Sequence, residues 1–299
     1  MLKNTKKISL IAIALMVAIL FANQAYAYEE TERNNTTIIR DVKTGDISVI
    51  EDDFIISTEF EEKGQLEVGK KNEILPTTIV GSDDRNVVLT VKANPYNCIA
   101  HIVATFPNST IERHGTAVIY GDKLALTAAH CVYEPEYGGW ATEVRVEVGR
   151  LQDLTMYGTV YAERYIAKNG FIENGLVDYD YAVLELSGMP ADDNGNTCGI
   201  ANLYVSAASI GANIMTAGYP CKTNREGIMY ESTGQILDKS STRIYHNADT
   251  EEGQSGSPVF DSNNNVIGIE HGYLEDDIYQ RNLAVRITSY ILDFCNSFK

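Results

Sequence analysis

The feature that most limits the fold is a series of short apolar runs from Ile79 onward, separated by Gly, Asn, Asp and Pro. Several runs alternate apolar and polar residues, a pattern typical of half-buried β-strands. One stretch near the end shows helical spacing instead, with an apolar face made by Ile287, Tyr290, Ile291 and Phe294. About 220 residues of short strands exceed one small barrel. The sequence therefore predicts an all-β fold of two packed antiparallel barrels with a C-terminal helix.

Residues 1–27 have the three parts of a secretory signal peptide. Lysines come first, an apolar run from Ile8 to Phe21 follows, and Ala25-Tyr26-Ala27 supplies a small-residue cleavage site. The apolar run is shorter than the roughly 20 residues of a spanning helix, which favours cleavage after Ala27 over an uncleaved membrane anchor. We expect a secreted, extracellular protein that is not bound to a membrane once the signal is removed.

Residues 28–78 differ in character from the chain that follows. They contain 13 acidic and 6 basic side chains and no cysteine. A segment of this composition buries little apolar surface on its own. We interpret it as an acidic pro-segment that is later removed, with a small structural domain as the alternative, and assign residues 79–299 to the main folded domain.

The net charge of −17 argues against nucleic acid and anionic membranes as partners, because no basic stripe offsets it. The sequence has no HExxH motif and no Cys-x-x-Cys pair, which argues against a metal-dependent hydrolase and a zinc site, so we expect no cofactor and no catalytic metal. Calcium binding stays open. In an exported chain the cysteines allow up to two disulfides and leave one thiol, with the pairing open. These residues are Cys98, Cys131, Cys198, Cys221 and Cys295.

The run EEGQSGSPVF (251–260) raises the question of a nucleophile at Ser255. Glycines at 253 and 256 let the backbone turn sharply and expose its N–H groups. A glycine-flanked serine indicates a nucleophile only when the chain also supplies a base and a carboxylate that orients the base.

His130 and Asp180 are the candidates for those two roles. His130 follows the apolar run KLALTAA, and Asp180 stands at the start of the strand 182–186. The neighbouring Asp178 is less suitable, because Asp180 directly abuts the strand and is expected to be partly desolvated there. The order His130, Asp180, Ser255 is the chain order of the chymotrypsin-type triad.

Together, TAAHC, DYAVLEL and GQSGSPVF resemble the trypsin-like serine peptidases, and more closely the bacterial glutamyl endopeptidases of the V8 type. The resemblance extends from IVGSDDR (79–85) to NLAVRIT (282–288). It implies a double six-stranded β-barrel with the triad between the barrels. It also implies a serine endopeptidase that acts on polypeptides through an acyl-enzyme. We expect a monomer made as a zymogen and cleaved between about Leu75 and Ile79.

The resemblance also assigns roles around the nucleophile. The backbone N–H groups of Gly253 and Ser255 are expected to form the oxyanion hole, and main-chain groups from His271 to Tyr273 to extend the bound substrate as an added strand. Gln254 stands where trypsin has an aspartate, so the buried ion pair that activates trypsin cannot form.

The predicted pocket departs from the glutamyl endopeptidase pattern. Glu270 replaces the histidine that binds a substrate glutamate, and His271 follows one place later, on the opposite face of a regular strand. Asp249 and Thr250 are further pocket candidates. An acidic pocket favours lysine or arginine, unless Glu270 is neutral, turned away or paired with a cation such as Arg286. Preference for basic residues, for glutamate, or a broader one all stay open.

The cysteines also depart from the trypsin-like pattern. The cysteine partner that many trypsin-like chains have about 16 residues before Cys131 is missing from RHGTAV (113–118), so Cys131 pairs elsewhere, for example with Cys98, or stays free.

The alternative function is a catalytically weak or silent trypsin-like fold that acts as a binding module. The intact set of three residues argues against it.

Overall fold

The computed structural model describes most of the chain, namely residues 31, 33–51, 74–75, 78–222, 227–274 and 281–299, with only the backbone of Ile74, Leu75, Tyr273 and Leu274. The predicted signal peptide, residues 1–27, lies outside these residues. Within the described ranges, no helix is long and apolar enough to cross a membrane.

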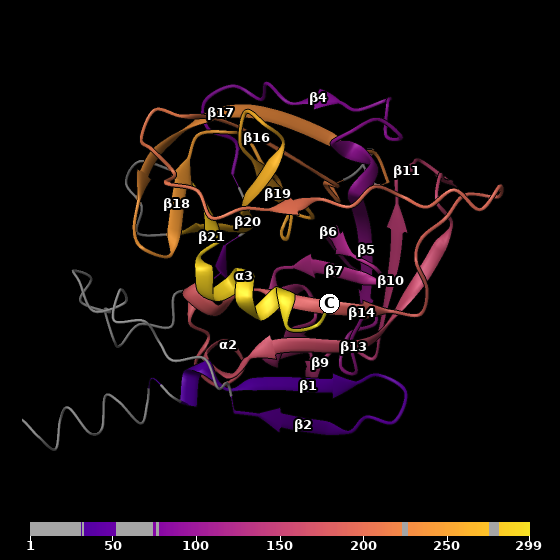
Figure 1. The fold of residues 1–299 in the computed structure, drawn as a ribbon. Coiled ribbons are helices and arrows are strands. Elements are labelled where there is room, and N and C mark those ends of the chain that lie inside the picture. Colours follow the sequence, from indigo (N-terminus) through magenta and orange to yellow (C-terminus); the bar gives the residue numbers. More distant parts are fainter. Residues whose placement is uncertain (1–30, 32, 52–73, 76–77, 223–226, 275–280) are drawn as a thin grey trace, which may run out of the picture.

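The first barrel is a closed ring of six antiparallel strands in the described chain (Figure 1). Their order is β10-β5-β6-β7-β14-β13, and pairing of β10 with β13 closes the ring. Apolar side chains such as Ile102, Leu126 and Val146 are fully buried in its core. The strands are β5 (Ile99–Thr105), β6 (Arg113–Gly121), β7 (Leu124–Thr127), β10 (Glu143–Val148), β13 (Thr159–Lys168) and β14 (Ala182–Leu186).

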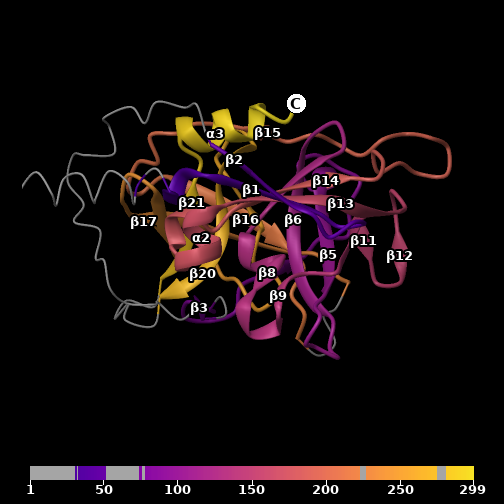
Figure 2. The same cartoon turned by 90° about the horizontal axis from the view of Figure 1, so that it is seen from below.

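The second barrel also closes from six antiparallel strands among the described residues, in the order β20-β19-β16-β17-β18-β21. A cluster that includes Ile214, Ile244 and Ile267 fills it. The two barrels lie side by side (Figure 2), so the predicted fold class is confirmed. The strands are β16 (Asn213–Gly218), β17 (Tyr230–Lys239), β18 (Arg243–His246), β19 (Pro258–Phe260), β20 (Asn265–Leu274) and β21 (Asn282–Arg286).

The C-terminal helix α3 (Ser289–Asn296) forms where helical spacing predicted it. The Thr288 hydroxyl caps it by accepting a hydrogen bond from the Ile291 backbone N–H at 3.2 Å. Phe294 packs edge-on against Tyr181 of the first barrel, with ring centroids 5.4 Å apart. The chain therefore leaves the second barrel and is held against the first.

Smaller elements complete the described fold. β15 runs parallel to β20, and β4 extends β17. Their bounds are β4 (Asn86–Val87), β8 (Tyr133–Glu134), β9 (Gly139–Trp140), β11 (Arg150–Leu151), β12 (Leu154–Thr155), α2 (Asn169–Asn174) and β15 (Asn202–Leu203).

The segment interpreted as a pro-segment adds strands to the outer edges of both barrels. β1 (Thr37–Asp41) pairs with β13, and β2 (Ile47–Ile50) pairs with β1. β3 (Ile74–Leu75) pairs with the end of β20. These three strands lie outside both closed rings, since each is added to a strand that already belongs to one.

A polar cluster joins the barrels. The Glu147 carboxylate on β10 contacts His101 Nδ1 at 3.2 Å and pairs with the Arg150 guanidinium. Tyr219, which follows β16, donates from its hydroxyl to the Arg150 carbonyl at 3.3 Å, and its ring lies 5.3 Å from the His101 ring. Because these groups come from both barrels, the cluster stabilises their relative position.

We expect the cluster around Glu147 to make the stability of the fold depend on pH. Burial raises the pKa of Glu147, but hydrogen bonds from His101 and Arg150 outweigh it and lower that pKa from 4.5 to about 2. A carboxyl group with a depressed folded-state pKa stabilises the fold above its unfolded pKa and loses that contribution as the pH falls toward the folded pKa. Glu147→Gln therefore lowers the melting temperature most near neutral pH, and the difference shrinks between pH 4.5 and about 2.

Thermal denaturation across this pH range measures the effect. Glu143→Gln, at an exposed position of the same strand, is the matched control and should leave the melting temperature almost unchanged. A destabilisation by Glu147→Gln that is the same at every pH would contradict the assignment.

Candidate functional site

Strand pairing in the first barrel brings His130 and Asp180 together. Ala182 at the start of β14 pairs with Thr127 at the end of β7. His130 lies in the 3₁₀ turn that follows β7, and Asp180 lies two residues before the first residue of β14. Both residues therefore stand at the same end of two adjacent strands.

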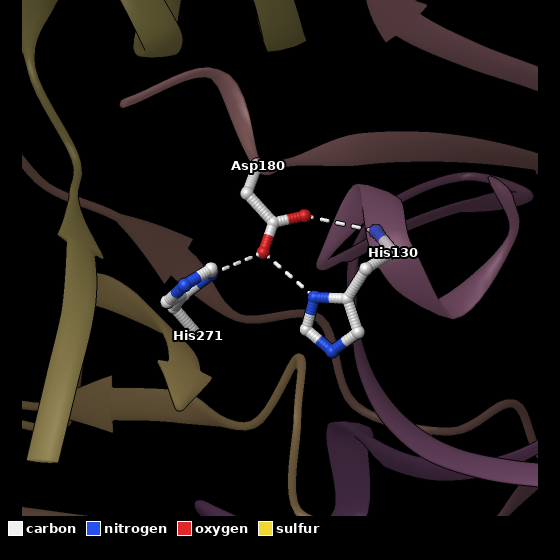
Figure 3. Close-up of side chains that lie close together, drawn as sticks. All are labelled: His130, Asp180 and His271. Carbon is white, nitrogen blue, oxygen red and sulfur yellow. Dashed lines mark hydrogen bonds and ion pairs between the residues drawn. The ribbon is translucent and has the colours of Figure 1, made fainter. Parts of the chain in front are cut away.

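The Asp180 carboxylate holds His130 through two hydrogen bonds (Figure 3). Oδ1 accepts from the His130 backbone N–H at 2.8 Å, and Oδ2 contacts Nδ1 of its ring at 2.7 Å. Two bonds to one residue set both the ring orientation and the Nδ1–H tautomer. The other ring nitrogen of His130 is turned away from Asp180 and can act as a base.

Burial and charge oppose each other at this pair. Burial raises the pKa of Asp180, but the charge and hydrogen bond of His130 and the hydrogen bond of His271 outweigh it and hold that pKa well below its usual range. Burial lowers the pKa of His130, while Asp180 and then Cys131 raise it, and the net pKa is well above 6.5. Asp180 therefore stays ionised and supports a positive charge on His130.

A second imidazole reaches the same carboxylate. His271 on β20 of the second barrel places Nδ1 2.5 Å from Asp180 Oδ2, and its ring stands edge-on to that of His130. The β20–β21 register shifts between Glu270 and Gly272, which allows this departure from regular alternation. The three ligand-type groups lie within 4.8 Å of one another, a spacing that metal sites share. Here both Nδ1 atoms contact the carboxylate directly.

The loop that carries Ser255 is held by the opposite barrel. The Ser255 carbonyl accepts hydrogen bonds from the Thr116 backbone N–H at 2.8 Å and from Cys131 Sγ at 3.6 Å. Thr116 Oγ1 donates to the Gly253 carbonyl at 3.0 Å. The Ser255 hydroxyl donates to the His271 carbonyl at 3.5 Å, and within the described residues it makes no hydrogen bond to His130.

The two predicted glycines are required by this loop. Gly253 has φ +95°, and a Cβ there would lie 2.5 Å from the Tyr219 carbonyl oxygen. Gly256 has φ +83°, and its Cβ would lie 2.1 Å from the Thr116 carbonyl oxygen. Among the described residues the backbone N–H groups of Gly253 and Ser255 have no acceptor, so both are available to an oxyanion.

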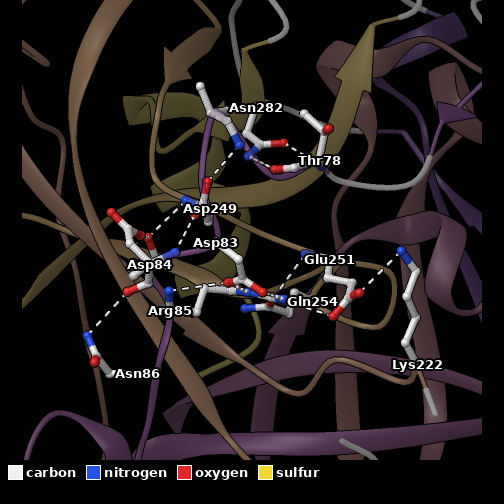
Figure 4. Close-up of polar contacts among 12 residues, drawn as sticks. Thr78, Asp83, Asp84, Arg85, Asn86, Lys222, Asp249, Glu251, Gln254 and Asn282 are labelled. Carbon is white, nitrogen blue, oxygen red and sulfur yellow. Dashed lines mark hydrogen bonds and ion pairs between the residues drawn. The ribbon is translucent and has the colours of Figure 1, made fainter.

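Asp249 anchors residues 80–84, close to the point where the main domain is expected to begin (Figure 4). It is buried, and its carboxylate accepts from the backbone N–H of Val80 at 2.6 Å and of Asp84 at 3.0 Å. Burial raises its pKa, partly opposed by these two donors. Both oxygens of Asp249 are thus engaged with the chain itself, and its role toward substrate stays a prediction.

Arg85 is a residue that the sequence analysis missed. Its buried guanidinium contacts Glu251 Oε2 and Gln254 Oε1, both at 3.0 Å (Figure 4). The positively charged side chain of Arg85 thus contacts Gln254, the neutral residue that directly precedes Ser255. No local motif links this arginine to the loop of Ser255, because Glu251 and Gln254 lie more than 160 residues away; its nearby partner is Asp83, whose Oδ2 lies 2.8 Å from Nη2.

Glu270, Thr250 and His246 form a second buried group. Glu270 Oε2 lies 2.9 Å from His246 Nε2, and Thr250 Oγ1 lies 3.5 Å from Glu270 Oε1. His246 was not a sequence candidate, and the cation suggested there, Arg286, instead donates to the Ser206 carbonyl at 2.5 Å. The side chain of Tyr273 lies outside the described set.

The expected disulfides are not found. All five cysteines are free, and Cys98, Cys131, Cys198 and Cys295 are buried. The Cys131 sulfur faces Gly115, where an added Cβ would lie 2.9 Å from it. Glycine thus occupies the place, 16 residues earlier, where a bridging partner would stand.

Comparison with known proteins then decides the family. The family profile described as "Trypsin-like peptidase domain" matches residues 115–269. The chain belongs to the trypsin-like peptidases. It is 31% identical over 204 residues to the glutamyl endopeptidase of Bacillus licheniformis, covering 68% of this chain and 61% of that protein. It is 22% identical over 302 residues to the glutamyl endopeptidase of Staphylococcus epidermidis, covering 98% and 96%.

A solved structure agrees with these sequence relatives. The fold is similar to that of a Glu endopeptidase in complex with MPD, with a TM-score of 0.65 and 25% identity over 74% of this chain and 99% of that one. The resemblance predicted from the motifs is therefore confirmed. Because the Bacillus licheniformis alignment spans about three fifths of that relative, at 61%, activity and substrates are matters for proposal.

His271 gives a sharp test of the site. His271→Leu removes the donor to Asp180, while His271→Asn keeps an N–H donor near the position of Nδ1. We expect His271→Leu to lower kcat by about tenfold to a hundredfold, since a hydrogen bond to a charged group contributes about 1.5–3 kcal/mol.

The pH profile separates this role from a loss of folding. Without His271 the Asp180 charge acts on His130 alone, so the pKa of His130 rises further and the acid limb of the activity profile moves to higher pH. His271→Asn should keep the limb near its wild-type position. Equal kcat values and equal acid limbs in the two variants would contradict a role for the Nδ1 donor.

Proposed function

We propose that the chain is a secreted serine endopeptidase that hydrolyses peptide bonds through His130, Asp180 and Ser255 and is made as an inactive precursor. The observation that carries this proposal is the Asp180 carboxylate, which holds His130 in the tautomer of a base. The glycine-constrained loop of Ser255 supports it further, because within the described chain the N–H groups of Gly253 and Ser255 have no acceptor. The substrates are polypeptides, and no cofactor, nucleic acid or second copy is required.

The proposed reaction proceeds through an acyl-enzyme. Substrate binding turns the Ser255 hydroxyl from the His271 carbonyl toward His130, whose free ring nitrogen takes its proton as Oγ attacks the carbonyl carbon. The N–H groups of Gly253 and Ser255 stabilise the oxyanion. His130 gives the proton to the leaving amine, and water then hydrolyses the ester by the same route in reverse.

The precursor state is supported by β3. Leu75 pairs with Tyr273 and Ile74 with Leu274, on the strand edge expected to extend a bound substrate. While β3 is paired there, a substrate strand cannot occupy that stretch of backbone. Cleavage between Leu75 and Ile79 would free the edge, and Asp249 would keep the new N-terminal segment in place.

The first experiment tests the nucleophile. The processed protein should react with a sulfonyl fluoride or organophosphonate probe and cleave peptides. Ser255→Ala should abolish labelling and lower kcat by about 10⁶-fold. Ser257→Ala, which removes a buried hydroxyl two residues away, is the matched control and should keep both properties. A processed wild-type protein that folds but neither reacts nor cleaves would favour the silent binding module.

For specificity, we propose a preference for lysine or arginine before the cleaved bond. Glu270 takes the place of the histidine in the glutamyl endopeptidase pattern, and its fully buried carboxyl group lies 2.9 Å from His246 Nε2. A buried negative charge repels a substrate glutamate and attracts a basic side chain. The glutamyl endopeptidase relatives favour glutamate instead.

Reporter peptides that differ only in Lys, Arg, Glu or Phe decide between these preferences. We expect Glu270→Gln to lower kcat/KM for Lys and Arg peptides by about tenfold to a hundredfold, the loss expected for a charge-assisted hydrogen bond. Glu252→Gln, at an exposed position of the nearby loop, should leave the preference unchanged. Cleavage after Glu alone would sink the basic preference.

A further inference from the structure

The N-terminal hairpin of β1 and β2 is built into the first barrel. β1 pairs along its whole length with the end of β13, from Thr37 opposite Lys168 to Asp41 opposite Arg164. Ile38 and Ile39 are buried, each 8% exposed, and belong to the main hydrophobic core. The hairpin thus covers a backbone edge and apolar surface that the barrel would otherwise expose to water (Figure 1).

Lys168 depends on this contact. The residue is fully buried at the end of β13, and Nζ donates to the Asn35 carbonyl at 3.0 Å and to Thr37 Oγ1 at 2.9 Å. The ammonium also lies 4.5 Å from the centre of the Phe294 ring of α3. A buried charge is tolerated only when donors and acceptors meet it. Without the hairpin segment, Lys168 loses two of its acceptors.

Helix α2, which directly follows β13, holds the same segment by further polar contacts. The Asn169 backbone N–H donates to the Thr36 carbonyl at 2.8 Å, and its side chain donates to the Arg33 carbonyl at 3.1 Å. The Asn174 side chain donates to Asn34 Oδ1 at 2.8 Å. The contacts therefore continue from β1 through residues 33–36, up to α2.

We propose that residues 33–50 stay bound to the main domain after the chain is cut, as a second chain that extends the sheet of the first barrel at the end of β13. The proposal rests on the zymogen proposed above and gives two parts of the acidic segment, residues 28–78, different roles. β3 blocks the substrate edge and leaves on activation, while the β1–β2 hairpin remains as part of the active enzyme. The partner that fits this face is the chain's own N-terminal hairpin.

The test does not need peptidase activity. Full-length protein with Ser255→Ala and a recognition sequence for a site-specific protease in place of residues 62–68 is cut and passed over a gel-filtration column. Mass spectrometry identifies the chains in each fraction. We expect the hairpin fragment to elute with the main domain and to separate only in denaturant. Separation in native buffer from a monodisperse, folded main domain overturns the proposal.

A matched pair of substitutions tests the contact itself. Ile39→Asp places a charge in the buried face of β1, and Ile47→Asp places one on β2, where the side chain is 54% exposed. After cutting, the Ile39→Asp fragment should dissociate at least tenfold faster than wild type, and the Ile47→Asp fragment at the wild-type rate. Equal dissociation of both variants and wild type shows that the β1 face does not hold the hairpin. If Ile39→Asp fails to fold, the wild-type cut complex still decides the question.

Discussion

The Asp180 carboxylate is the group on which the arrangement of the site depends. A fully buried carboxylate is stable only when donors meet its charge, and here the donors come from both barrels. His130 belongs to the first barrel and His271 to the second. Any displacement of one barrel against the other would leave the buried charge with fewer donors. The same contacts that orient the His130 ring therefore also hold the two barrels in position relative to each other.

The loop of Ser255 is also held in place by contacts from the first barrel. Thr116 of the first barrel holds it at two backbone carbonyls, and glycine is required at 253 and 256 because the surrounding backbone leaves no room for a Cβ. At its other end the loop is tied to residues 78–85 through Asp249 and Arg85. The segment freed by the proposed processing is thus in direct contact with the wall of the predicted pocket.

Most of the fold could be predicted from local pattern. Alternating apolar runs indicate strands, and glycine around Ser255 indicates a sharp turn, because each depends on neighbours within a few residues. The contacts that the sequence did not predict join residues that lie far apart in the chain. Arg85 meets Glu251 and His246 meets Glu270 only after distant strands have paired, and neither has a signal in its own neighbourhood. The disulfides that an export signal allows are absent, since all five cysteines are free.

The sequence by itself determined the barrels, the closing helix, the family and the identity of three candidate catalytic residues. It did so because strand periodicity and short motifs are local properties of the chain. Only the tertiary structure decided that His271 contacts Asp180, that Asp249 serves the main chain, and that β1 belongs to the first barrel. These outcomes depend on a register shift in β20, on burial and on which strand edges are left open. Such quantities exist only after the strands have assembled.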